Sequence, residues 1–299
     1  MIDHYYIFTV LIAIVCVVIS AFIHEIGHFL CAKLTRFPVE VFSFGFGPQL
    51  VDFRLGETDI RFSLIPLGGY VTVVHEDFAK DPRGEAWWDF LKRVLFYGAG
   101  VASNIALAGF LYASHAYLLI PKDPAPLARL PGTVLIASEI GTGLRGVPQP
   151  ARISHLRALE GCASFTALHR GVKETFRMVC LTGKELVKIS SFRTIFKNVE
   201  GPIAIAGVAK RQAGLGLRYL MLFAAALSIN SAIINLLPLP GMDGGHIAIL
   251  GFERMAGRRL RDRTRNRIFT AGMVSLMLVM GVLVCFDLKN SHQMQLHKN

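Results

Sequence analysis

The sequence predicts an α-helical membrane protein with four transmembrane helices, a membrane-associated β-hairpin or small sheet after the first helix, and a reduced extracytoplasmic loop. Composition is the first observation: 53% of the 299 residues are hydrophobic, only 18% are charged, and the mean hydropathy is +0.46. Length is the second, because a helix needs ~20 apolar residues to cross a bilayer core. Four segments meet this requirement and are expected to span the membrane: 5–32, 94–120, 219–239 and 268–286.

Lysine and arginine predict the orientation of these spans. The loops after the first and third spans are rich in basic residues: Lys33, Arg36, Lys92 and Arg93 in one, and seven arginines within 254–267 in the other. Short basic loops stay on the cytoplasmic side, so both chain termini and the 121–218 loop are expected outside. The net charge of +11 then reflects topology and contact with anionic lipid. No motif favours a nucleic-acid partner.

The chain is expected to divide into two halves of one membrane core. Residues 1–120 form the first half and 217–288 the second, followed by a tail, 289–299. Residues 121–169 are rich in proline, which predicts an irregular extracytoplasmic connector that is too short for a typical domain.

Residues 170–216 are expected to form an amphipathic extracytoplasmic segment. Within 170–197, apolar side chains recur among many lysines and arginines, with an interruption at Gly183. Such a segment either lies on the outer membrane surface or packs against the helix bundle. Cys162 and Cys180 are both expected outside, where they could pair, but the sequence gives no distance between them.

Residues 40–74 are expected to form the β region. Val41–Phe44 and Ile60–Leu64 alternate with a period close to two, and glycines punctuate the segment. The region follows the first span directly, so an exposed strand edge there could bind an extended peptide by strand addition. The alternative is a solvent-facing hairpin with no special role.

His24, Glu25 and His28 lie inside the first span. Residues four apart share a helix face, so the two imidazoles can hold one metal ion while Glu25 acts as a general base. Ionisable groups at membrane depth are costly and therefore indicate a function. The alternative is an accidental match to a short pattern on an ordinary helix.

Asp243 is the expected third metal ligand. The first and third spans run in the same direction, because one reversal separates each consecutive pair. Both His28 and Asp243 lie near the C-terminal end of their span, so they are expected at the same depth. Two imidazoles and one carboxylate make a catalytic zinc site with an open fourth position. Pro238 and Pro240 break the third span, and irregular backbone at that depth must be buried or line a wet cavity.

With these motifs, the chain resembles the site-2 protease family of intramembrane zinc metalloproteases, in the regulator-of-sigma-E protease branch. HEIGH at 24–28 and NLLPLPGMDGG at 235–245 carry the resemblance. Further matches are VFSFGFGP at 41–48, FSLIPLGGYV at 62–71 and NVEGPIAIAGVA at 198–209. The resemblance implies one Zn²⁺ held by His24, His28 and Asp243, with Glu25 as the catalytic carboxylate.

Five residues are expected to contact substrate. Asn235 and Asn230 could donate to a substrate carbonyl or oxyanion, or could instead link helices. The other three belong to the matched motifs: Gly45, Gly47 and Asn104. The family's second span usually carries A-G-P-x-x-N, and here Val101 replaces the proline while Asn104 remains.

The expected function is cleavage of a peptide bond within or near the transmembrane segment of a single-span membrane protein. An anti-sigma factor or a remnant signal peptide would be a suitable substrate, and the bacterial inner membrane a suitable location. Relatives carry PDZ domains between the second and third spans, and this chain shows no such carboxylate-binding turn. An upstream protease or a gating partner could replace that filter. The alternative function is a non-proteolytic zinc-binding scaffold or metal carrier on the same fold.

Overall fold

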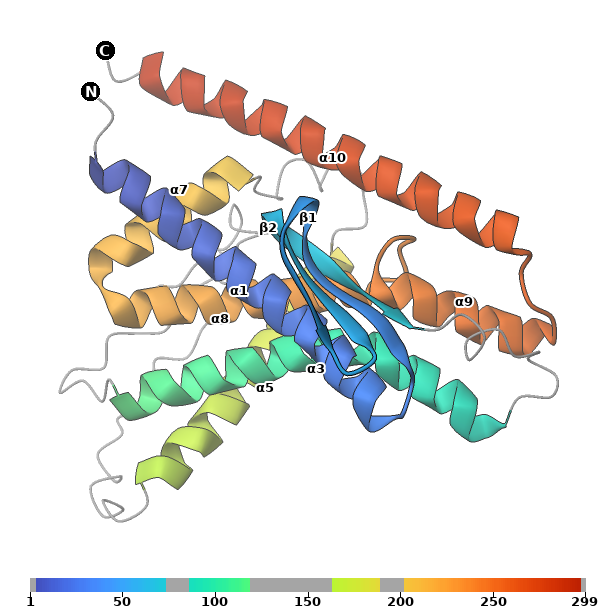
Figure 1. Ribbon diagram of the computed structural model, residues 1–299. Coiled ribbons are helices and arrows are strands. Elements are labelled where there is room, and N and C mark those ends of the chain that lie inside the picture. The colour runs from blue at the N-terminus through green and yellow to red at the C-terminus, as the bar shows by residue number, and fades with distance from the viewer. Residues whose placement is uncertain (1–3, 74–85, 119–162, 189–201, 297–299) are drawn as a thin grey trace. The chain divides into compact units, whose positions relative to one another are not determined.

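A computed structural model of the chain describes residues 4–73, 86–118, 163–188 and 202–296 (Figure 1). Residue contacts divide the chain into two compact units. The core unit consists of 17–104 and 231–278, and the flanking unit consists of 1–16, 105–230 and 279–299.

Among the residues that the structure describes, three helices are long and apolar enough to cross a membrane. Their apolar segments are Ile14–Leu34, Trp87–Tyr117 and Tyr219–Leu236, which coincide with the first three predicted spans to within a few residues at most ends. The predicted fourth span lies inside α10 (Asp262–Leu296) but is not one of these three, so the count of four remains a prediction. The helix α10 also continues through most of the predicted tail.

The predicted β region is a two-stranded antiparallel sheet. Strand β1 comprises Val39–Leu55 and β2 comprises Thr58–Val73, so both strands extend beyond the predicted segments. The strands bend so that the first half of β1 has partners on both sides: Phe42 pairs with Val71 and also with Ile60. Ile60 in turn pairs with Phe53, which places this part of β2 in the interior of the sheet.

The hairpin packs on one side of α1 (His4–Leu34), as Figure 1 shows. Phe22 lies 4.8 Å from Phe44 and Phe29 lies 5.2 Å from Phe42, measured between ring centroids, and both pairs are edge-on. Edge-on pairs are favoured because the positive ring edge meets the negative ring face. This aromatic cluster fixes the side of α1 that faces the sheet.

A different side of α1 packs on α3 (Trp87–Leu118) with very little separation. A Cβ atom at Gly27 would lie 2.5 Å from the carbonyl oxygen of Ala99, so only glycine fits there. Ser103 Oγ donates to the carbonyl of Ile23 at 2.9 Å, from α3 to α1. Small residues at such crossings are typical of helices that associate in membranes, because they allow backbones to approach closely.

A short non-helical segment separates α8 (Leu217–Leu236) from α9 (Asp243–Ala256). Leu239 N donates to the carbonyl of Leu237 at 2.7 Å, and Gly241 has φ of 99°, which glycine adopts without strain. A Cβ atom at Gly244 or Gly245 would collide with the preceding backbone, so the start of α9 is folded tightly back on the turn. Asp243 is therefore held at the first residue of α9.

The flanking unit contains α5 (Ala163–Lys188) and α7 (Pro202–Leu215). Its hydrophobic core includes Val208 and Ala209 of α7 and Phe223 of α8. Helix α5 runs unbroken through Gly183, so the predicted interruption at that residue is wrong. Five residues of α5 share one buried face: Ala167, Gly171, Thr175, Met178 and Thr182.

This buried face of α5 packs against the part of α3 in the same unit, where a Cβ atom at Gly171 would lie 2.7 Å from Cβ of Ala113. Val172 and Phe176 point away and are 58% and 71% exposed. A glycine inside a helix, such as Gly183, destabilises that helix by about 1 kcal/mol. The packing of the buried face of α5 against α3 outweighs this penalty. Most of the predicted connector and Cys162 lie outside the described residues, so the cysteine pair remains a prediction.

Candidate metal centre

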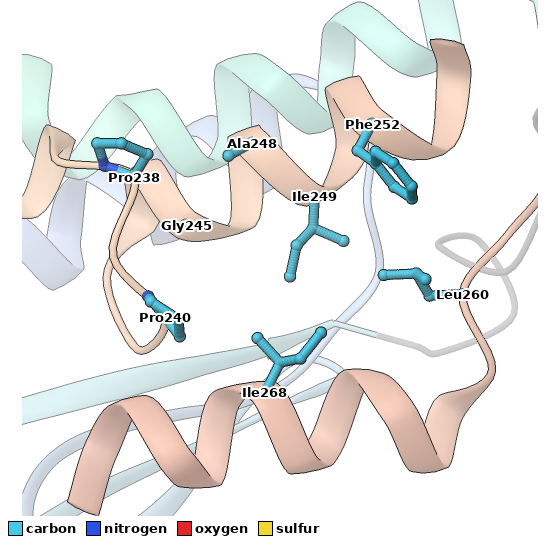
Figure 2. Close-up of a pocket in the computed structure, with 8 residues that line it drawn as sticks. All are labelled: Pro238, Pro240, Gly245, Ala248, Ile249, Phe252, Leu260 and Ile268. Carbon is cyan, nitrogen blue, oxygen red and sulfur yellow. The ribbon is translucent and has the colours of Figure 1, made fainter. Parts of the chain in front are cut away.

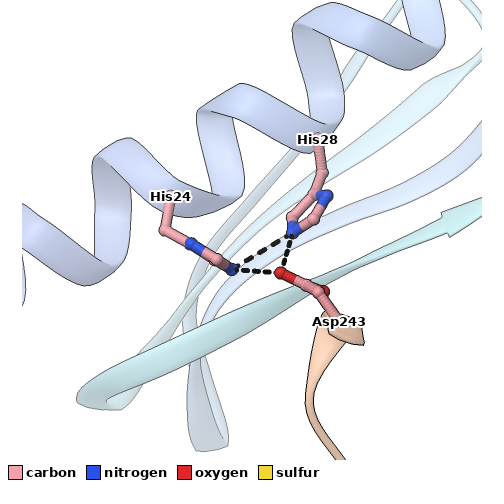
Figure 3. Close-up of side chains that lie close together, drawn as sticks. All are labelled: His24, His28 and Asp243. Carbon is pink, nitrogen blue, oxygen red and sulfur yellow. Dashed lines mark hydrogen bonds and ion pairs between the residues drawn. The ribbon is translucent and has the colours of Figure 1, made fainter. Parts of the chain in front are cut away.

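His24 and His28 occupy successive turns of α1 and point toward the start of α9 (Figure 3). Their Nε2 atoms are 3.2 Å apart, and the two residues are only 8% and 6% exposed. Oδ2 of Asp243 lies 3.0 Å from Nε2 of His24 and 3.3 Å from Nε2 of His28. All three residues belong to the core unit. Residues 215 positions apart in the chain therefore meet at one point.

The three ligand atoms have the spacing that zinc requires. Zinc binds imidazole nitrogen and carboxylate oxygen at about 2.0–2.2 Å in a tetrahedron, which places neighbouring ligand atoms roughly 3.3 Å apart. The separations between the three atoms here are 3.0, 3.2 and 3.3 Å. Two nitrogens and one oxygen leave a fourth position open, as catalytic zinc sites do.

The backbone of α3 selects the tautomer of His28. Nδ1 of His28 lies 2.8 Å from the carbonyl oxygen of Phe96, and because a carbonyl only accepts, Nδ1 must carry the proton. Nε2 of the neutral ring then presents a lone pair toward the carboxylate of Asp243. Two lone pairs at this distance repel each other unless a positive charge lies between them, so the arrangement fits a metal ion.

The electrostatics of Asp243 lead to the same conclusion. Burial by itself would raise the pKa of Asp243, but the two imidazoles beside it, when protonated, outweigh burial and lower the pKa to about 2. A metal cation bound between neutral imidazoles acts on the pKa in the same direction. The carboxylate is thus ionised at neutral pH, which is the form that binds metals. Asp243 also lies at the N-terminus of α9, where the helix dipole favours a negative charge.

His24 contacts a different residue of α3. Its Nδ1 lies 3.5 Å from Nδ2 of Asn104, and the same amide lies 3.3 Å from Oγ of Ser231 on α8. Asn104 is 0% exposed. The structure therefore places Asn104 beside a metal ligand in a buried position, and its expected contact with substrate remains a prediction.

Gly100 forms the floor of the site. A Cβ atom at this position would lie 2.6 Å from Nε2 of His24 and closer still to Nε2 of His28. Any larger residue would therefore enter the space in which the ligand atoms converge. Gly100 and the Phe96 carbonyl were not predicted from the sequence as parts of the site, although the A-G-x-x-x-N run at 99–104 contains Gly100.

Glu25 follows His24 on α1 and is partly buried. It lies against the second strand of the sheet, since a Cβ atom at Gly69 would be 2.9 Å from Cγ of Glu25. The backbone of β2 at Gly69 therefore runs directly past the predicted general base. Within the described residues, the other flank of 69–73 has no strand partner.

His246 fixes α9 between two neighbouring helices. Its ring stacks on Tyr97 of α3 with centroids 4.4 Å apart, and on Phe269 of α10 with centroids 4.1 Å apart. Burial, with a smaller effect from the positive charge of Arg265, lowers the pKa of His246 to about 4, so the ring is neutral at physiological pH. These stacks orient the helix that carries Asp243.

An apolar cavity of about 380 Å³ lies beside the same helix (Figure 2). Pro238 and Pro240 form one wall, Ile249 and Phe252 of α9 another, and Ile268 of α10 a third. Gly245, two residues after Asp243, also lines it. The cavity has the chemical character needed to receive an apolar side chain close to the metal centre.

The other four residues that are expected to contact substrate differ in burial and in the unit to which they belong. Asn235 is partly buried at the last turn of α8 within the core unit, whereas Asn230 is 2% exposed and belongs to the flanking unit. Gly45 and Gly47 have φ of 93° and 85°, and they allow β1 to bend. A Cβ atom at Gly45 would lie 2.8 Å from the carbonyl of Ser63. Their contact with substrate remains a prediction.

Comparison with known proteins places the chain in a family. It matches peptidase family M50 over residues 12–279. A Campylobacter jejuni protein named as a candidate zinc metalloprotease is 27% identical over 87% of both chains, and a Nostoc protein named in the same way is 27% identical over 92% of this chain and 94% of its own. Protease RseP of Yersinia pestis is 32% identical over 56% of this chain and 37% of its own. Because the family match covers most of the chain, this protein belongs to peptidase family M50, as its resemblance to the site-2 proteases predicted.

Proposed function

We propose that this chain is a zinc endopeptidase that cleaves a peptide bond within or near the transmembrane segment of a single-span membrane protein. The convergence of His24, His28 and Asp243 within 4.8 Å of one another, with Glu25 next in sequence to His24, is the observation that carries the proposal. The names of the relatives and the donor set of the site both indicate zinc. An apolar cavity beside α9 suits a substrate that comes from the membrane.

The chain's own residues account for the proton transfers. Bound zinc supplies a Lewis acid that polarises a carbonyl group and makes water more acidic. Glu25 accepts a proton from the attacking water and delivers it to the nitrogen of the leaving amine. Asn235, at the end of α8, is the candidate donor to the oxygen that becomes negative as water adds. His24, His28 and Asp243 keep their ligand atoms in place throughout.

The free edge of the sheet is the proposed binding site for the substrate backbone. A helical segment must unwind before its carbonyls can be attacked, and an extended chain can then pair with an exposed strand. Gly69 of this strand lies against Glu25, so a peptide paired with the outer flank of Gly69–Val73 would lie about one strand spacing, ~4.8 Å, from the strand that contacts the general base. Several residues within Ile60–Leu64 have strand partners on both flanks and cannot take another strand.

Asn104 is proposed to position His24 and not to contact substrate. An amide has an oxygen and a nitrogen of similar size, and turning it over presents Oδ1 to Nδ1 of His24. Oδ1 can then accept the Nδ1 proton, which directs the Nε2 lone pair at the metal. The pairing is the side-chain counterpart of the bond between His28 and the Phe96 carbonyl.

The orientation of the chain completes the proposal. The basic loops that contain Lys33 and Lys92 and the 254–267 segment face the cytoplasm, and both termini lie outside, in a bacterial inner membrane. Access to the site then depends on substrates that are already short outside or on a separate gating partner. Val172 and Phe176 of α5, exposed on its outer side, are suited to contact the membrane surface.

The first prediction tests the catalytic assignment. Glu25→Gln keeps the three ligands but removes the proton acceptor, so proteolysis should fall by about 10²–10⁴-fold while zinc stays bound. Zinc content and cleavage of a single-span substrate should be measured on the same purified variant, with His24→Ala as the variant that loses metal. Equal zinc loss in both variants would make Glu25 a ligand. Normal cleavage by Glu25→Gln would contradict the proposed function.

The second prediction tests Asn104. Replacing it with leucine removes the acceptor for His24 at similar volume and should weaken zinc binding by about 10–100-fold, as loss of such partners typically does. Competition with a chelator measures this change. Asn104→Asp should restore most of the affinity because its carboxylate can accept the same proton, and Ser231→Ala is the control that keeps the amide. Wild-type zinc affinity in Asn104→Leu would assign the residue to packing alone.

The third prediction tests the strand edge. Successive backbone N–H groups of a strand point to opposite flanks, so one of Tyr70→Pro and Val71→Pro removes an outward donor and the other an inward one. The outward variant should fold and hold zinc but lose about fivefold in kcat/KM, the effect of one hydrogen bond of about 1 kcal/mol. Proline within Ile60–Leu64 should instead disrupt the sheet. Full activity in every folded variant would exclude this edge as the binding site.

A further inference from the structure

A second cavity lies where α1 ends and α3 begins, within the core unit. Its volume is about 450 Å³. Residues from the last turn of α1 and the first turns of α3 line it, and six of them matter to its chemistry: Leu34, Arg36, Trp88, Leu91, Lys92 and Leu95. The ends of two segments long and apolar enough to span a membrane, Ile14–Leu34 and Trp87–Tyr117, meet here, and the surface of a bilayer is expected at such ends.

The first half of this cavity is apolar and open. Leu34 is 84% exposed, Leu95 is 51% exposed and Trp88 is 69% exposed. Large apolar side chains grouped in this way indicate an interaction site. Tryptophan is enriched at the membrane interface because its ring is apolar and its N–H is polar. The apolar half therefore has the side chains that suit contact with lipid near the surface of a bilayer.

The second half is positively charged. Arg36 and Lys92 line the cavity, and Lys92 has an ion pair with Asp89 at 3.6 Å. Two cations and one carboxylate leave a net charge of +1. No acidic partner of Arg36 is found among the residues that the structure describes. A ligand with one negative charge would balance this group, whereas a zwitterionic one would not.

The end of α1 places Arg36 at the cavity at the expense of backbone strain. Phe37 N donates to Ala32 O at 2.8 Å and Arg36 N to Lys33 O at 3.2 Å, which is the hydrogen-bond pattern that closes a helix with a left-handed residue. That residue is normally glycine, but here it is Arg36, with φ of 60°. It is the one non-glycine residue with positive φ in the described part of the chain. The helix end therefore fixes the backbone of Arg36 at the cavity, with the guanidinium on an exposed side chain.

We propose that this cavity binds one anionic phospholipid. The phosphate lies between Arg36 and Lys92, which a guanidinium and an ammonium can both contact. One acyl chain runs along Leu34, Leu91 and Leu95, and Trp88 lies at the level of the glycerol. A bound lipid would connect the end of α1, which carries two of the metal ligands, with the start of α3, which packs against it, and would stabilise the folded state by mass action. The site is independent of the proposed peptidase activity.

Fluorescence of Trp88 tests the proposal directly, because the chain has two tryptophans and Trp87→Phe leaves one. The full-length Trp87→Phe protein is placed in phosphatidylcholine vesicles that contain either brominated phosphatidylglycerol or brominated phosphatidylcholine. Bromine on the acyl chain quenches nearby tryptophan. Brominated phosphatidylglycerol should quench at a lower mole fraction, and the preference should fall roughly fivefold for each cation lost in Arg36→Gln and Lys92→Gln.

Matched variants separate a built site from general surface charge. Arg261→Gln with Arg263→Gln removes two exposed cations elsewhere in the core unit and should leave the preference unchanged. Leu34→Ser keeps every charge and should weaken quenching by phosphatidylglycerol, because it removes part of the acyl-chain wall. The side chains of Leu34, Arg36 and Lys92 are not among the buried residues, so these variants should fold. Size-exclusion chromatography checks this.

Three outcomes would overturn the proposal. Equal quenching by the two brominated lipids would show that the cavity does not select an anion. Equal loss of preference in the control pair and in the Arg36 and Lys92 variants would assign the effect to diffuse surface potential. Displacement of brominated phosphatidylglycerol by inorganic phosphate at constant ionic strength would show that the cavity binds a free anion and not a lipid.

Discussion

The close contact between α1 and α3 is the constraint on which the metal centre depends. Glycine at position 27 lets the two backbones meet, and glycine at position 100 leaves room for the two imidazoles above it. The carbonyl of Phe96 then receives the Nδ1 proton of His28 at 2.8 Å. In a membrane the lipid is as apolar as the side chains, so helix association relies on such close packing and on hydrogen bonds between helices. One helix crossing thus determines both ligand position and tautomer.

The third ligand, Asp243, is positioned by a turn and a helix start and not by the crossing of α1 and α3. The backbone breaks after Leu236, turns at Gly241 and begins a new helix at Asp243. Stacking of His246 between Tyr97 and Phe269 then orients that helix against α3 and α10. A carboxylate that is buried, ionised and at a helix N-terminus meets two imidazoles, and a cation makes this group of charges stable. The strand edge at Gly69–Val73, whose first residue lies against Glu25, is the proposed place for an extended chain.

Several parts of this arrangement could be predicted from the sequence. The spacing of His24 and His28 is a property of any helix, and the shared direction of the first and third spans brings Asp243 to the same depth. The Phe96 carbonyl could not be predicted, because every residue has a carbonyl and only the crossing of two helices selects this one. The position of Asn104 was also unpredictable, since its amide is suited equally to substrate or to a buried imidazole.

The sheet and α5 show where local patterns are insufficient. Alternation predicted two strands, but it could not show that β1 bends and pairs on both sides, which makes Ile60 interior and leaves Gly69–Val73 as an edge. Gly183 suggested a break in α5, yet the buried face from Ala167 to Thr182 keeps the helix continuous. In both cases the deciding contacts come from residues distant in sequence.

X-ray absorption at the zinc edge of the purified full-length protein tests the central claim most directly. One zinc per chain is expected, bound by two imidazole nitrogens and by carboxylate or water oxygens at about 2.0–2.2 Å, with no sulfur ligand. A zinc–sulfur distance of about 2.3 Å, or a shell without imidazole, would contradict it, because the metal would then be bound by residues other than His24, His28 and Asp243.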